Sequence, residues 1–220
     1  MTTVTQRVIQ LLRDTTIVGT KSFTFNSTPY TLGPSLRAPS EEDLPMVFFK
    51  YAPIDYVREN SNAYVNHVLN NMPIQHKHRR VLVDVKLHDL NEGDVPCIPG
   101  WHCDSIVDPF HKSRPEVHHI FVTGAGCLTE FMKSLVELNI EKDDMFNSLR
   151  RQLKQKQGLE TFHVDSCRIM SYSRFSFHRG VSAKKKEKRL LIRVTESDII
   201  KPSIKKTTRL GLTWPTPADY

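Results

Sequence analysis

The stretch RVLVDVKLHDL, residues 80–90, alternates two sets of side chains with the period of a β-strand. One set is aliphatic: Val81, Val83, Val85 and Leu87. The other set mixes apolar and polar side chains: Leu82, Asp84, Lys86 and His88. Alternation of this kind is typical of a sheet with one buried face, so the stretch predicts a half-buried strand.

Other stretches of strand character lie on both sides. On the C-terminal side they are residues 116–124, 127–132, 160–173 and 189–197. The first two are close enough in sequence to predict a hairpin. On the N-terminal side, residues 20–45 are rich in Ser, Thr, Pro and Gly, which indicates loops with one short strand at SFTF, residues 22–25.

Three segments have helical character instead. Residues 5–13 form a short amphipathic pattern, and residues 59–73 place apolar side chains at helical spacing before Pro73. Residues 134–158 read as one polar helical segment that closes at Gly158.

Short strands at fairly regular spacing, with helices at the front, favour a mainly β protein with flanking helices, either a barrel or a jelly roll. A parallel βαβ fold needs helices between most strands, and the pattern lacks them. We expect a single domain over residues 1–220. Its predicted parts are a helical and loop region at 1–79, a β core at about 80–197 with the helical insertion at about 134–158, and a tail at 198–220.

The composition favours a globular protein in the cytoplasm without a membrane partner. Charged residues make up 25% of the chain, and no apolar run approaches the roughly 20 residues that span a bilayer. The four cysteines form no CxxC pair, so we expect them to be reduced.

The charge is unevenly distributed. Residues 1–140 hold 13 Lys and Arg against 15 Asp and Glu, whereas residues 141–220 hold 18 against 9. The basic half includes RRQLKQK at 150–156 and KKKEKR at 184–189. Such a surface attracts nucleic acid or anionic small molecules, or it simply keeps the protein soluble.

The stretch WHCDSIVD, residues 101–108, carries a histidine and an aspartate two residues apart. On an extended segment, His102 and Asp104 project to the same side, with Trp101 and Cys103 on the other. One imidazole and one carboxylate can bind a divalent metal when a third ligand comes from elsewhere. Two histidines and one carboxylate form the facial triad of non-haem Fe(II) oxygenases.

With a second histidine at His178, and Arg189 opening RLLIRV eleven residues later, the arrangement resembles the Fe(II)- and 2-oxoglutarate-dependent oxygenase superfamily. The resemblance covers roughly residues 80–197. It implies a double-stranded β-helix, a jelly-roll or cupin-like core. It also implies that His102, Asp104 and His178 bind Fe(II) and are catalytic.

The resemblance further implies a cationic residue that binds the distal carboxylate of the cosubstrate 2-oxoglutarate. Arg189 is the first candidate because it opens its strand, and Arg193 is the second because it would face the same side. The implied reaction consumes molecular oxygen, converts 2-oxoglutarate to succinate and carbon dioxide, and hydroxylates a C–H bond of a substrate.

Several other residues leave alternatives open. His118 and His119 are neighbours, so only one can face inward, and packing is the simpler role for both. Tyr172, Ser173 and Thr129 are candidates for hydrogen bonding to the cosubstrate, or for ordinary strand packing. A small-molecule substrate is slightly favoured over nucleic acid or a nucleotide. The alternative to an enzyme is a non-catalytic, cupin-like module that binds a metal or another ligand.

Overall fold

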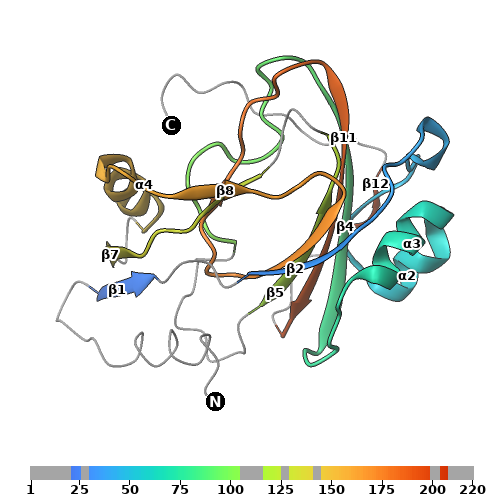
Figure 1. Cartoon of the computed structure of the whole chain (residues 1–220). Coiled ribbons are helices and arrows are strands. Elements are labelled where there is room, and N and C mark those ends of the chain that lie inside the picture. Colours follow the sequence, from blue (N-terminus) through green and yellow to red (C-terminus); the bar gives the residue numbers. More distant parts are fainter. Residues whose placement is uncertain are drawn as a thin grey trace.

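A computed structural model describes residues 21–25, 30–104, 116–124, 129–140, 145–198 and 204–207. Figure 1 shows a mainly β protein with helices at its periphery, as the sequence predicted. The helix predicted at 5–13 and most of the predicted tail lie outside the described residues.

The elements run in the order β1 (Lys21–Phe25), β2 (Tyr30–Ser35), a 3₁₀ turn η1 (Glu41–Asp43), β3 (Phe48–Pro53), α2 (Ile54–Asn60), α3 (Ala63–Asn71), β4 (Arg80–Leu90), β5 (Val117–Val122), β6 (Glu130–Met132), β7 (Val136–Ile140), α4 (Met145–Gln155), β8 (Thr161–His163), β9 (Arg168–Ser173), β10 (His178–Arg179), β11 (Glu187–Ser197) and β12 (Ile204–Thr207). None of the helices in the described ranges combines the length and the apolar character that crossing a membrane requires.

The largest sheet has seven strands in the order β12-β3-β4-β11-β5-β9-β2, and every pairing is antiparallel. At its centre, β4 and β11 pair over their whole length, from Arg80 opposite Ser197 to Leu90 opposite Glu187. Both strands have eleven residues and lack Gly and Pro, so nothing interrupts their ladder of hydrogen bonds.

One face of this sheet packs against helices α2 and α3 (Figure 1). Val83 and Val85 of β4 and Ile192 of β11 are fully buried there with Val65 and Val68 of α3. The aliphatic set read from residues 80–90 therefore faces the helices, as its period predicted.

The opposite face of the large sheet is also covered, so the prediction of a half-buried β4 was wrong. A three-stranded sheet, β10-β6-β8, lies over it. Phe131 of β6 packs with Ile120 and Val122 of β5 and with Met170 of β9. The result is a sandwich of two sheets, and the polar set of β4 points into its interior.

Three other predictions need correction. Strand β6 pairs with β10 and β8, not with β5, so the predicted hairpin does not form. The segment predicted as one helix begins with β7, whose Val136 and Leu138 are buried beneath α4. The region predicted as helix and loop supplies β2 and β3 to the large sheet.

The N-terminus of α3 is capped by a side chain. Asn62 accepts a hydrogen bond from the backbone N–H of Val65 at 2.9 Å, and its amide donates to the Asp43 carbonyl at 2.8 Å. The first bond satisfies one of the four N–H groups that a helix leaves open at its start.

We expect Asn62→Ala to lower the free energy of unfolding by about 1 kcal/mol, because it removes this cap. Urea unfolding followed by circular dichroism measures the change. Asn62→Ser is the matched control, since it keeps a capping oxygen and loses only the bond to Asp43. Equal losses in the two variants would assign the effect to Asp43 and not to the cap.

Candidate metal centre

Three side chains from two distant parts of the sequence converge inside the sandwich. The ligand atoms of His102, Asp104 and His178 all lie within 4.8 Å of one another. Both histidines are buried, and the Asp104 side chain is 22% exposed. The structure therefore brings these three predicted residues together, and together they can hold a metal ion.

The two histidines are joined through their backbones. The N–H of His102 donates to the carbonyl of His178 at 3.0 Å, and the N–H of His178 donates to the carbonyl of His102 at 2.9 Å. This reciprocal pair extends the smaller sheet beyond β10. Residues directly opposite each other in an antiparallel pair project to the same face, and the two ring centroids lie 4.4 Å apart.

The outer sides of these residues are used for packing. Cys103 lies in an apolar cluster with Leu149 and Leu153 of α4, and Trp101 packs against this cluster. The side chains therefore alternate as the sequence predicted, with His102 and Asp104 inward and their neighbours outward.

Each histidine is oriented by a main-chain carbonyl. The Nδ1 atom of His102 lies 2.8 Å from the Gly100 oxygen, and that of His178 lies 3.0 Å from the Ser176 oxygen. A carbonyl can only accept, so each Nδ1 must carry a proton, and in the neutral imidazole Nε2 then keeps its lone pair. This is the second contact by which metal-ligating histidines are usually held, so the residues present fit a metal ion.

Gly180 allows the chain to pack tightly next to β10. A Cβ atom at this position would lie 2.6 Å from the Cys97 oxygen and 2.7 Å from Val95 Cγ1. The N–H of Gly180 also donates to the Ile98 carbonyl at 2.8 Å. The segment that leads into His102 is thus held against the segment that carries His178.

Asp104 lies among polar side chains that include two hydrogen-bond donors, Arg193 and Tyr172. Its Oδ2 atom lies 2.8 Å from Arg193 Nη1, 3.4 Å from the Tyr172 hydroxyl and 3.9 Å from His118 Nε2. Burial opposes the charged form of Asp104, but Arg193 and the nearby histidines outweigh it and hold the pKa of Asp104 well below its usual range. The carboxylate is therefore ionised and ready to bind a cation.

Arg193 links this carboxylate to a second one. Its Nε and Nη2 atoms donate to Asp84 Oδ2 at 3.0 and 2.7 Å. Asp84 also accepts from the N–H of Tyr51 at 2.9 Å, at a bulge where Tyr51 has a φ of 50°. Arg193 lies in the interior of the central strand pair, and both acidic partners fix its position.

Arg189 lies on the same inward face of β11, as predicted, but it is the third residue of that strand and not the first. It is almost fully buried, at 1% exposure, and donates to the Thr129 hydroxyl at 3.1 Å. Two residues of β4 lie beside it in the ladder: His88 is directly opposite, and the half-buried Lys86 is opposite Leu191. The inward face of the central strand pair therefore carries several cations, of which Arg193 contacts the Asp104 carboxylate.

Burial controls the protonation of the histidines in this interior. It lowers the pKa of His102 to about 4, and the nearby His178 adds to this shift. It also lowers the pKa of His88 to about 3, and Arg189 contributes to that shift. Both imidazoles are therefore neutral at physiological pH.

The remaining sequence candidates are divided between the site and the packing. His118 faces the site, where its Nδ1 lies 3.0 Å from the Thr195 hydroxyl. His119 faces the helices and contacts Glu196 at 3.0 Å. Tyr172 contacts Asp104, whereas the Ser173 hydroxyl lies 3.5 Å from that of Ser176, away from the ligands.

Sequence reasoning did not assign Asp84 or His118 to the site. Each lies two residues along its strand from other inward residues, so strand period was the signal that pointed to a common face. Which of the two neighbouring histidines turns inward depends on the pairing with β11, where His118 lies opposite Thr195.

Comparison with known proteins gives little further information. No family model matches the chain, and no curated protein matches it. A solved structure described as the crystal structure of CapF with inhibitor 3-isopropenyl-tropolone is similar at a TM-score of 0.20 and 7% identity, over 57% of this chain and 30% of that one. The matched part thus spans less than a third of that chain.

We expect Arg193→Ala to weaken metal binding, because Asp104 loses the donor that orients it. Loss of such a supporting contact typically lowers metal affinity about 10- to 100-fold. The buried Asp84 also loses its ion pair, which should lower the free energy of unfolding by about 3 to 5 kcal/mol. Titration with Mn(II), followed by the electron paramagnetic resonance of the free ion, measures the affinity.

Arg193→Lys provides a folded variant for the same measurement, since it keeps the charge and loses the bidentate fork. Arg168→Ala is the control, because it removes an arginine that pairs with Asp165 on the surface. Unchanged Mn(II) affinity in both Arg193 variants would contradict a role in holding Asp104.

The low pKa of His88 predicts a loss of stability in acid. Below the ordinary value of 6.5, the unfolded chain takes up a proton that folded His88 binds only near pH 3. Stability therefore falls with pH, by up to about 1.4 kcal/mol per pH unit from this residue. Between about pH 6 and pH 4, the free energy of unfolding of His88→Gln, measured in urea, should depend less steeply on pH than that of the wild type. The control His67→Gln, at an exposed position on α3, should keep the wild-type dependence.

Proposed function

We propose that the protein is an Fe(II)- and 2-oxoglutarate-dependent oxygenase whose sandwich is a double-stranded β-helix. The observation that carries this proposal is the convergence of His102, Asp104 and His178 within 4.8 Å, inside the sandwich into which the buried Arg189 also points. Two histidines and one carboxylate leave several metal positions open for other ligands, which is the arrangement used by non-haem Fe(II) oxygenases.

In this proposal, His102 and His178 bind the metal through Nε2, because Gly100 and Ser176 accept from the opposite ring atoms. Asp104 supplies the carboxylate ligand, and Arg193 and Tyr172 hold it in place. When bound, Fe(II) would supply the oxidation that couples decarboxylation of 2-oxoglutarate to hydroxylation of a substrate C–H bond by molecular oxygen.

Arg189 is the residue that best suits the distal carboxylate of 2-oxoglutarate. Its planar guanidinium can donate two parallel hydrogen bonds to a carboxylate. Arg193 is engaged by two carboxylates, Asp84 and Asp104, and Arg189 donates to the Thr129 hydroxyl. Thr129 orients the Arg189 guanidinium, which supports the cosubstrate role that the family resemblance implies for Arg189.

The charge of the interior also favours an anionic cosubstrate. In the middle of β4 and β11, three cations, Lys86, Arg189 and Arg193, share their inward face with one carboxylate, Asp84. A divalent metal at the triad adds to this positive charge, which Asp104 partly offsets. A dicarboxylate bound between the metal and Arg189 would bring the interior closer to neutrality, which lowers the cost of burying these charges.

For the substrate, we propose a small molecule that enters the sandwich near the triad. We propose that the protein acts in the cytoplasm. Burial of both histidines supports a ligand that is small enough to approach an enclosed centre. The competing hypothesis remains a cupin-like module without catalysis. Such a module needs no buried arginine beside its metal, so Arg189 distinguishes the two.

The proposal is tested by incubating the protein with Fe(II), ascorbate, oxygen and 2-oxoglutarate and measuring succinate. We expect slow formation of succinate even without substrate, and its loss in His178→Ala. In parallel, 2-oxoglutarate should raise the melting temperature in the presence of Mn(II), because a ligand that binds the folded state stabilises it. A metal that binds without any effect of 2-oxoglutarate would favour the binding module.

We expect Arg189→Ala to raise the concentration of 2-oxoglutarate required for half-maximal turnover about 30- to 4,000-fold. The basis is that truncating one partner of a buried charge pair costs about 2 to 5 kcal/mol. Arg189→Lys should fall in between, because an ammonium keeps the charge without the fork. Mn(II) affinity should stay near that of the wild type, which separates this variant from those at Arg193. Normal turnover of Arg189→Ala would contradict the assignment.

A further inference from the structure

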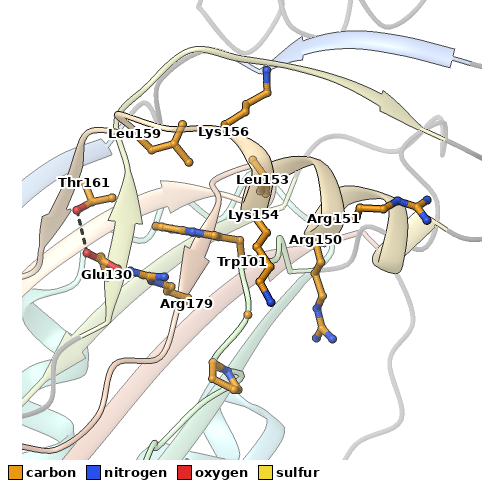
Figure 2. A pocket seen from close by; sticks show the side chains of 12 residues that line it. Trp101, Glu130, Arg150, Arg151, Leu153, Lys154, Lys156, Leu159, Thr161 and Arg179 are labelled. Carbon is orange, nitrogen blue, oxygen red and sulfur yellow. Dashed lines mark hydrogen bonds and ion pairs between the residues drawn. The ribbon is translucent and has the colours of Figure 1, made fainter. Parts of the chain in front are cut away.

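A basic groove lies on the outer side of the smaller sheet (Figure 2). Helix α4 and the residues after it form one wall, and the segment before His102 forms the other together with β6, β8 and β10. Its volume of about 680 Å³ lies within the range of pockets that hold organic ligands. The lining residues are Pro99, Gly100, Trp101, Glu130, Arg150, Arg151, Leu153, Lys154, Lys156, Leu159, Thr161 and Arg179.

Positive charge dominates this lining. Five of the residues are Lys or Arg, and Glu130 is the single carboxylate among the described lining residues. Glu130 is neutralised locally, because it accepts from Arg179 and from the Thr161 hydroxyl. The four other cations belong to the sequence RRQLKQK, residues 150–156, which the metal centre does not use.

The helix sets the spacing of these cations. Arg150 and Lys154 are four residues apart, so they project from the same face of α4, about 6 Å apart along its axis. Figure 2 shows both side chains extending to the same side of the helix. This spacing is comparable to the distance between neighbouring phosphates of an extended nucleic-acid strand.

The groove also has an aromatic and apolar part. The Trp101 ring lies between α4 and Arg179 in Figure 2, and the Arg179 guanidinium lies 4.7 Å from the ring centroid. Leu153 and Leu159 complete the apolar part. An aromatic ring beside a row of cations matches the two parts of a nucleotide, since a base can stack and a phosphate can pair.

We propose that this groove binds single-stranded nucleic acid, with phosphates along α4 and a base against Trp101. A duplex presents only its backbone to such a surface and leaves the apolar part without a partner, whereas an unpaired base has a free aromatic face. The inference does not depend on the proposed oxygenase activity, because the groove and its charges exist whatever the triad binds.

The groove adjoins the two segments that carry the histidine ligands. Trp101 directly precedes His102, and Arg179 directly follows His178, with opposite orientations in each pair because side chains alternate in extended chain. A bound strand would therefore lie on the outer side of these segments, behind the metal centre.

The test is fluorescence anisotropy of a labelled oligothymidine of about 12 nucleotides, titrated with the whole protein at salt concentrations from about 50 to 200 mM. The double variant Lys154→Gln and Lys156→Gln removes two exposed charges of the groove. We expect its affinity to fall about 25-fold at about 100 mM salt, and the slope of log affinity against log salt to become shallower by about 1.4. In a Trp214→Phe variant, where Trp101 is the remaining tryptophan, binding should change the tryptophan emission.

The matched control removes two charges elsewhere, with Arg58→Gln on α2 and Arg80→Gln at the start of β4, and should keep the wild-type affinity and slope. The proposal is overturned if the labelled strand does not bind, or if the control weakens binding as much as the groove variant. It is also overturned if a mononucleotide competes as well as the strand, which would assign the groove to free nucleotides. Equal competition by polyglutamate would assign it to acidic polymers in general.

Discussion

Two reciprocal backbone hydrogen bonds, between His102 and His178, determine the geometry of the candidate metal centre. They make the two imidazoles direct neighbours on one face of the smaller sheet, independently of any side-chain contact. The carbonyls of Gly100 and Ser176, each two residues before a ligand, then select the ring nitrogen that faces the centre. Position and protonation of both histidines therefore follow from the main chain, which is the least variable part of a folded protein.

The carboxylate ligand is controlled differently, through buried charge. Asp104 and Asp84 are held by one guanidinium, and isolated charges in such an interior would be strongly unfavourable. Arg193 pairs with both and offsets part of their charge, so the site can keep an ionised ligand that is only partly exposed to water. Arg193 is thus committed to the protein's own carboxylates, and Arg189 of the same strand donates to the Thr129 hydroxyl. These contacts could not be read from the positions of the two arginines after His178.

The sequence predicted those features that depend on local period or on a short motif. Residues 80–90 and 189–197 alternate over their length, and α3 places Tyr64, Val65, Val68 and Leu69 in the core at the expected spacing. Strand β7 was missed because it is short and lies just before a polar helix. Its two buried side chains, Val136 and Leu138, were therefore read as part of the helical pattern. Strand β2 contains Gly33 and Pro34 and is largely exposed at the sheet edge, where proline is tolerated but the period is lost. The partner of Arg193 could not be read at all, because register between distant strands is not encoded in either strand alone.

The long separation of the two central strands along the chain affects how the protein folds. Asp84 and Arg193 are 109 residues apart in the chain, yet they meet in the central strand pair. Contacts of such long range are formed only after the loop entropy of the intervening chain has been lost, and proteins dominated by them fold slowly. Strands β4 and β11 must therefore pair before Arg193 can hold the Asp104 carboxylate in place. A newly synthesised chain thus acquires its complete metal centre only when β11, near the C-terminal end of the core, has emerged and paired.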